Sequence, residues 1–310
     1  MSLSHTLAVY EALDAPRASG ATVQALLDGV AGITCEVERV TGAKGATDFV
    51  RIVVPGARGH RAGGDAPTLG IVGRLGGVGA RPSRIGLVSD ADGAIAAVAA
   101  ARKLAFMHRN GDVLPGDVVI ATHICPDAPT KPHVPVDFMD SPVSIEQMNQ
   151  REITPDMAAV LSIDTTKGNR ILNTRGFAIS PTVKEGWILK VSPDLVRLME
   201  VTTGRAAVTF PITMQDITPY GNGVDHVNSI LQPATATTAP VVGVAIAAAT
   251  AVPGCATGAS HEVDIAEAVR FAIEVAKELG AGVTRFHDAD EFARLVALYG
   301  DMRRLQGPGA

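Results

Sequence analysis

The feature that most constrains this chain is a series of short, continuously apolar segments, each bounded by polar or glycine-rich sequence. Segments of this kind, rich in Val, Ile and Ala, are typical of strands that are buried on both faces of a sheet. The clearest examples are residues 68–72, 85–88, 118–122, 157–163 and 241–248. Because parallel strands need long crossover connections, helices are expected between them.

Longer segments with helical spacing do separate the apolar ones, at residues 93–109, 193–203, 264–279 and 289–298. Further strands are expected at residues 33–40, 49–55 and 210–215. This alternation predicts an α/β fold with three layers, in which helices cover both faces of a mostly parallel, doubly wound sheet. No internal repeat interrupts the pattern, so residues 1–310 are expected to form one domain.

Composition narrows the class of protein. The net charge is −5 and no basic stripe occurs, which argues against a nucleic-acid partner. The longest apolar run, residues 240–252, is too short to span a membrane, and the first residues lack a secretory pattern. Three cysteines are too few for a disulfide framework, so a cytoplasmic location is expected.

Polar side chains follow five of the predicted strands at their ends. In open α/β sheets, ligands bind outside the carboxyl ends of the strands. Five polar groups at five strand ends therefore predict a common site, although they lie far apart in the sequence. The five residues are Asp90, His123, Asp164, Asp225 and His261.

Four motifs in a fixed order carry a resemblance to a known group of enzymes. They are ITPDMAAVLSIDTT at 153–166, LVSDADGAIAAVAAARKL at 87–104, SHEVDIAEAV at 260–269 and FPITMQDITPYGNGVDHV at 210–227. Their order resembles that of the co-catalytic zinc exopeptidases, especially the glutamyl and tetrahedral aminopeptidases. The chain also resembles a divergent bacterial and archaeal family of unknown function related to them. The expected fold is therefore of the zinc-exopeptidase type.

The resemblance implies a set of metal ligands. Asp90 would bridge two metal ions, Asp164 would bind the first ion and His261 the second, with His123 as a further candidate. Carboxylate and neutral imidazole are suitable ligands for zinc, and an anionic bridge offsets the repulsion between two ions. One or two ions of zinc or another divalent metal are thus expected.

The chain departs from the family pattern at two motifs. The family motif Gly-His-x-Asp-Glu-x-Gly aligns with residues 73–79, where Arg74 replaces the His and Gly76 replaces the Asp. The Glu-Glu pair, which supplies the general base and a ligand, aligns with Cys125 and Pro126. The segment before Asp90 is too short for the family's inserted dimerisation domain. A homo-oligomer is still expected, but not the family's cage-like assembly.

Each candidate also has an ordinary structural interpretation. Asp90 could cap a helix, and Asp164 could form an Asx turn. Cys125 could be a small core residue or a reactive thiolate, and Asp127 could replace the lost ligand carboxylate; these two are the candidates for a catalytic group. Arg74, a permanent cation, would repel a metal but suit a substrate carboxylate or phosphate.

The sequence thus predicts a divergent, metal-dependent hydrolase that acts on a small amide or peptide-like substrate with an acidic group. Arg74, Asp225 and His226 are the expected substrate-binding residues. The alternative is a metal-free protein of the same ancestry that binds a small anion as an accessory or sensor. In the hydrolase hypothesis, the general base is not assigned to a residue.

Overall fold

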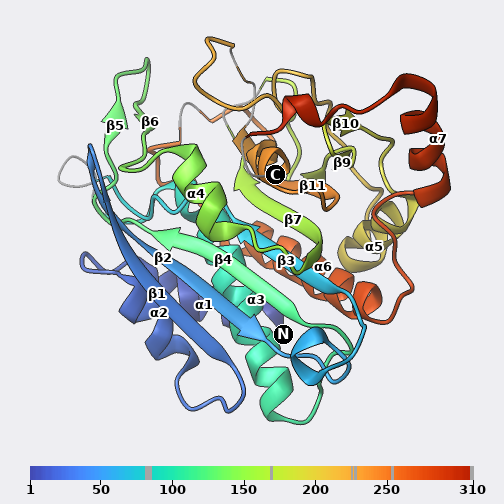
Figure 1. Cartoon of the computed structure of the whole chain (residues 1–310). Coiled ribbons are helices and arrows are strands. Elements are labelled where there is room, and N and C mark those ends of the chain that lie inside the picture. Colours follow the sequence, from blue (N-terminus) through green and yellow to red (C-terminus); the bar gives the residue numbers. More distant parts are fainter. Residues whose placement is uncertain (81–85, 168–169, 225, 227–228, 253–254, 308–310) are drawn as a thin grey trace.

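Four buried parallel strands form the centre of the sheet. The computed structural model describes residues 1–80, 86–167, 170–224, 226, 229–252 and 255–307. The central strands are β4 (Val118–Ile124), β3 (Thr68–Gly73), β7 (Met157–Thr165) and β11 (Val241–Ala247), side by side in that order. They are parallel throughout, so their carboxyl ends share one edge (Figure 1). Their nearly continuous apolar sequences match burial on both faces.

Antiparallel strands extend the sheet on both sides. A hairpin of β1 (Thr34–Gly42) and β2 (Gly45–Val54) pairs with β4 through β2. On the other side, β11 pairs with β8 (Gly176–Ile179) and β9 (Val183–Lys184), and β9 pairs with β10 (Trp187–Ile188). A separate two-stranded sheet consists of β5 (Thr130–Lys131) and β6 (Phe138–Met139). The expected α/β fold with a parallel sheet core is confirmed.

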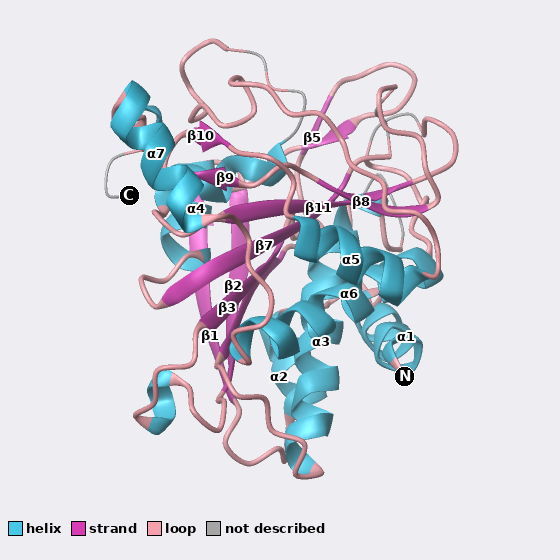
Figure 2. Ribbon diagram, turned by 90° about the vertical axis from the view of Figure 1, so that its right-hand side faces the viewer, coloured by secondary structure: helices cyan, strands magenta, loops and turns pink. Residues whose placement is uncertain are grey.

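The two faces of the sheet are covered unequally (Figure 2). One face carries most of the helices, and their bounds are α1 (Ser2–Leu13), α2 (Gly20–Leu27), α3 (Asp92–Arg109), α5 (Pro193–Thr203) and α6 (Glu262–Gly280). The other face is covered by α4 (Ile145–Glu152) and by a 3-10 segment, η3 (Ser229–Ala236), while α7 (Ala289–Tyr299) lies at the periphery. Alternate strand residues therefore belong to two separate hydrophobic cores.

A close approach of backbones fixes the start of α3 against the sheet. A Cβ on Gly93 would lie 1.9 Å from the carbonyl oxygen of Arg74 and 2.4 Å from that of Ile163. Only glycine fits there without displacing the backbone at the ends of β3 and β7. This contact brings the short 3-10 turn η2 (Ser89–Ala91), which precedes α3, to the carboxyl edge of the sheet.

Two predicted strands are absent from the described residues. Residues 86–88 form no strand and lead directly into η2, and residue 85 lies outside the described part. Residues 211–215 are irregular; next to them only Thr209 makes an isolated bridge, to Ile179. Phe210 is instead buried in the second core, which explains why this segment is apolar. The remaining short segments are η1 (His60–Ala62) and η4 (Arg303–Leu305). No helix of the described chain has the length and apolar character needed to cross a membrane.

Candidate functional site

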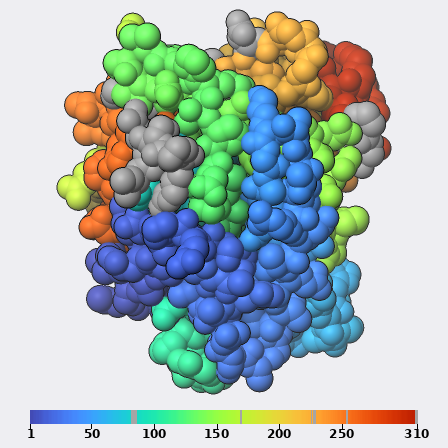
Figure 3. All heavy atoms as spheres, turned by 90° about the vertical axis from the view of Figure 1, so that its left-hand side faces the viewer, coloured from blue at the N-terminus to red at the C-terminus, as the bar shows by residue number. Residues whose placement is uncertain are grey.

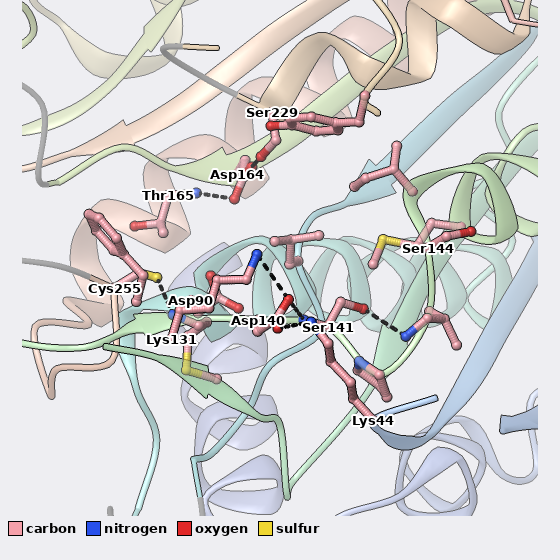
Figure 4. A pocket seen from close by; sticks show the side chains of 18 of the residues that line it. Lys44, Asp90, Lys131, Asp140, Ser141, Ser144, Asp164, Thr165, Ser229 and Cys255 are labelled. Atoms are coloured by element: carbon pink, nitrogen blue, oxygen red, sulfur yellow. Dashed lines mark hydrogen bonds and ion pairs between the residues drawn. The ribbon is translucent and has the colours of Figure 1, made fainter. Parts of the chain in front are cut away.

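A pocket of about 1240 Å³ opens at the carboxyl ends of the central strands. Side chains from the ends of β3 and β7, from η2, from the β1–β2 turn and from the start of α4 line it (Figure 4). This is the position at which open α/β sheets bind their ligands. The fold therefore creates the site, and residues distant in sequence supply its chemistry.

Two buried aspartates, Asp90 in η2 and Asp164 in β7, face this pocket. Asp90 is 4% exposed and accepts hydrogen bonds from the Gly77 backbone and from the Cys255 thiol. Asp164 is 3% exposed and accepts hydrogen bonds from the Thr165 backbone N–H at 2.7 Å and from the Ser229 hydroxyl at 3.3 Å. The structure thus brings together two of the side chains that the sequence singled out.

Burial raises the pKa of both carboxyl groups. Burial raises the pKa of Asp164 to about 6, against hydrogen bonds from Thr165 and the positive charge of Arg74. Burial raises the pKa of Asp90 well above its usual value, and the negative charge of Asp164 adds to this effect. The pocket therefore holds two carboxyl groups that both keep their protons to a higher pH than an exposed aspartate does.

A second buried charge pair lies at the same end of the pocket. The ammonium of Lys167 contacts the carboxylate of Asp92, and both side chains are essentially unexposed. Lys167 also donates to the carbonyl of Ala259 at 2.6 Å, and the Ser260 hydroxyl donates to Asp92 at 2.6 Å. Sequence reasoning missed Lys167. The available signal was its place just past the strand that ends with Asp164.

His226 supplies an imidazole to the pocket. Its ring lies 4.3 Å from the ring of Tyr220, and both residues line the pocket. Both of its ring nitrogens are buried, with no hydrogen-bond partner in the part of the chain that the structure describes. The imidazole is therefore free to bond to a ligand. Asp225, expected beside it, lies outside the described residues.

Arg74 lies beneath the pocket and not on its surface, in contrast to the expected role in substrate binding. Its side chain is fully buried, with Nε 2.8 Å from the Glu152 carboxylate and Nη2 bonded to the Asn149 side chain. A guanidinium already neutralised inside the protein cannot meet a substrate carboxylate. Burial raises the pKa of Glu152 to about 7, although the charge of Arg74 opposes this rise.

The two polar candidates of β4 and its end are also turned inward. His123 is 2% exposed; its Nε2 accepts from the Gly76 backbone at 3.1 Å and its Nδ1 lies 2.9 Å from the Thr47 hydroxyl. Burial lowers its pKa to about 3, so both nitrogens of a neutral ring are engaged. Cys125 is buried away from the pocket, and burial raises its pKa to about 11, which suits an inert thiol.

His261 and Asp127 do not line the pocket. His261 precedes α6 with a side chain that is 54% exposed, and its Nδ1 lies 3.9 Å from the Asp264 carboxylate. Asp127 is exposed beyond the end of β4. Neither side chain is thus brought near Asp90 and Asp164 in this conformation.

The donors that face the pocket do not fit a two-metal centre. Within the described residues, no three His, Cys, Asp or Glu side chains come together as a group that could hold a metal ion. The pocket lining offers the carboxyl groups of Asp90, Asp140 and Asp164, the imidazole of His226 and the thiol of Cys255, with the cation of Lys167 among them and that of Arg74 close to Asp164. Positive charges at this position oppose the binding of two divalent ions.

Comparisons with known proteins agree with the fold. The profile of a family described as "Protein of unknown function (DUF1177)" matches residues 38–309. No curated protein matches this chain. The apo structure of leucyl aminopeptidase from Trypanosoma brucei is similar, with a TM-score of 0.52 and 12% identity, over 87% of this chain and 60% of that chain. A mutant of tomato leucine aminopeptidase matches over the same shares, with 12% identity and a TM-score of 0.49.

This chain therefore spans less than two thirds of either aminopeptidase chain. At 12% identity, the likeness to the trypanosomal enzyme shows the fold alone. The resemblance to zinc exopeptidases that the sequence predicted is confirmed at the level of fold, as is the relation to a family of unknown function.

Proposed function

The chain belongs to the DUF1177 family, and we propose that it hydrolyses an amide bond in a small, peptide-like substrate. The observation that carries the proposal is the pair of buried carboxyl groups, Asp90 and Asp164, at one pocket. Burial raises both pKa values, and the negative charge of Asp164 raises that of Asp90 further, so we assign Asp164 as the ionised group and Asp90 as the protonated one. The aminopeptidase-like fold supports a hydrolase of this class.

Two carboxyl groups in these states can act as base and acid on an amide. Asp164 accepts a proton from a water molecule as the water oxygen bonds to the carbonyl carbon, and Asp90 protonates the carbonyl oxygen. The resulting diol then loses its amine. The C–N bond breaks, the nitrogen takes the proton from Asp164, and Asp90 regains a proton from a hydroxyl. The products are a carboxylic acid and an amine, and both aspartates return to their starting states.

Two neighbouring groups would assist this reaction. The ring nitrogens of His226 have no hydrogen-bond partner among the described residues, and they can bond to the polar end of a bound amide. The Ser229 hydroxyl bonds to Asp164 and orients its carboxylate. Because the donor set does not fit two metal ions, no step of the reaction is assigned to a metal.

The proposal is tested with a panel of N-acyl amino acids and dipeptides, and product is measured by mass spectrometry. Asp90→Asn and Asp164→Asn should each lower kcat/KM at least about 100-fold, as expected for the loss of a general acid or base. Asp127→Asn is the matched control, because Asp127 is exposed and does not line the pocket. Full activity in the two pocket variants would refute the proposal.

A metal titration separates this reaction from the metal-dependent one that the sequence predicted. Activity should persist in chelator and should not rise when zinc or manganese is added. A strict metal requirement would instead assign Asp90 and Asp164 to metal binding. Saturable binding without product would favour the second candidate function, a small-anion-binding accessory protein, which the lysines at the pocket mouth support.

A further inference from the structure

The charged side chains of the pocket are divided between two ends. The floor carries Asp90, Asp164 and Lys167, all of which are buried. The mouth carries Lys44 and Lys131, whose side chains are 53% and 63% exposed. Lys44 comes from the β1–β2 turn and Lys131 from β5, two segments that lie side by side on the surface in Figure 3.

One aspartate holds both mouth lysines. The carboxylate of Asp140 contacts the ammonium of Lys44 through one oxygen and lies 3.3 Å from that of Lys131 through the other (Figure 4). Asp140 is only 13% exposed, and its pKa is lowered by hydrogen bonds from Lys44 and Ser141 against the effect of burial. Among the ion pairs of the described residues, these two cations share one anion, which leaves one positive charge in excess at the mouth.

Apolar side chains line the same pocket as these charged groups. They come from the loop after β3, from β6 and from the start of α4. These residues are Leu75, Phe138, Met139, Val143, Ile145 and Met148. A ligand that contacts both the lysines and the aspartates therefore also has apolar side chains available to it, and we expect part of the ligand to be apolar.

We propose that the pocket selects amides that carry a carboxylate at the end remote from the reacting bond, with an apolar portion between. The carboxylate lies at Lys44 and Lys131, the apolar portion contacts the apolar side chains of the pocket, and the amide reaches Asp90 and Asp164. The inference rests on the proposed function for the identity of the amide. The anion site itself requires only the charge imbalance at the mouth, which an anionic group corrects.

This assignment replaces the role that the sequence gave to Arg74. An acidic substrate group was expected to meet that guanidinium, but Arg74 is buried against Glu152. The mouth lysines come from parts of the chain that the sequence did not connect with the site. Their exposure makes each contact modest, since water screens exposed ion pairs.

Calorimetric titration of the full chain with two probes tests the inference. 6-Acetamidohexanoate carries a free carboxylate that five methylene groups separate from its amide, and its carboxamide has no carboxylate but is otherwise the same. The acid should bind at least about fivefold more tightly than the amide at low salt. In Lys44→Gln/Lys131→Gln this ratio should fall below about twofold, because Asp140 is then left as an unpaired anion at the mouth.

Lys277→Gln is the matched control, because Lys277 is a lysine of similar exposure, 43%, paired with Glu274 on α6 away from the pocket. It should keep the wild-type ratio. Unchanged affinity for the amide in the double variant would show that its pocket is intact. Equal binding of the two probes, no saturable binding of the acid at millimolar concentration, or full preference in the double variant would overturn the inference.

The same titration distinguishes failure of the inference from failure of the proposed function. If the acid binds more tightly than the amide but no product forms, the anion site is supported and the proposed hydrolase activity is refuted. If both probes are hydrolysed with equal KM, the proposed hydrolase activity is supported and the anion site is refuted.

Discussion

Arg74 and Glu152 form an ion pair in which Nε lies 2.8 Å from a carboxylate oxygen and neither side chain is exposed. The pair joins the end of β3 to the end of α4, directly beneath the pocket. Arg74 also contributes a positive charge that lowers the pKa of Asp164. One buried cation thus connects the packing of two elements with the ionisation of the site.

Breaking this pair from one side should be costly. Arg74→Met leaves Glu152 buried without its cation and should lower the free energy of unfolding by about 3–5 kcal/mol. Arg74→Met/Glu152→Gln removes both charges and should recover most of this loss. Denaturant titration measures both values. Arg197→Met, which breaks the partly exposed pair with Glu278, is the control and should cost about 1 kcal/mol or less. Equal losses in the single and double variants would contradict the expectation.

The buried carboxyl of Asp164 should make stability depend on pH. Burial raises its pKa from 3.8 to about 6, so between these values the folded state keeps a proton that the unfolded state has released. Stability therefore falls as the pH rises through this window and is constant above it. Asp164→Asn cannot ionise, and it should gain stability over wild type by roughly 3 kcal/mol between pH 4 and pH 7.

Unfolding free energies at several pH values between 4 and 7 measure this difference. The exposed Asp127→Asn is the control, and its difference from wild type should stay constant over the range. A difference for Asp164→Asn that shrinks as the pH rises would have the wrong sign and would reject the buried, ionisable state of Asp164.

The fold was predictable because its signals are local. Each central strand is a short apolar run, and each long helix has its own spacing; the predicted segment 118–122 became β4, and 264–279 became α6. The failures at residues 86–88 and 211–215 have a physical cause. A short apolar run also suits an irregular segment that packs on a core, as Phe210 does.

The site was predictable only in part. Asp164 lies near the end of the parallel strand β7, whereas the described residues 86–88 before Asp90 form no strand, and Asp90 reaches the same pocket because Gly93 allows α3 to begin close to the ends of β3 and β7. The partner of a buried charge depends on packing between distant elements, and no spacing rule reveals it. From the sequence, Arg74 was therefore expected to bind an anion at the surface. In the structure, Arg74 is buried and the carboxylate of Glu152 neutralises its charge. Lys167 was not considered, although it contacts Asp92.

Gly77 should control the position of Asp90. A Cβ on Gly77 would lie 2.5 Å from Oδ2 of Asp90, and the Gly77 backbone also donates to that carboxyl group. Gly77→Ala should displace the Asp90 side chain and abolish amide hydrolysis, while stability falls by about 1–3 kcal/mol through overpacking. Activity and denaturant titration measure the two effects. Gly258→Ala is the control, because a Cβ there meets nothing within 4 Å. Wild-type activity in Gly77→Ala would show that the Asp90 position is not critical.

Lys167 should be required for folding stability more than any exposed lysine. Lys167→Met leaves the fully buried Asp92 carboxylate with only the Ser260 hydroxyl, and it should lower the free energy of unfolding by about 3–5 kcal/mol. Lys167→Met/Asp92→Asn should recover much of this loss, because a neutral amide can accept from Ser260 without a charge to desolvate. Lys277 pairs with the partly exposed Glu274 on the same helix, so Lys277→Met should change the free energy of unfolding by about 0.5 kcal/mol or less. A loss for Lys167→Met as small as that control would mean that Asp92 is protonated in the folded protein and needs no cation.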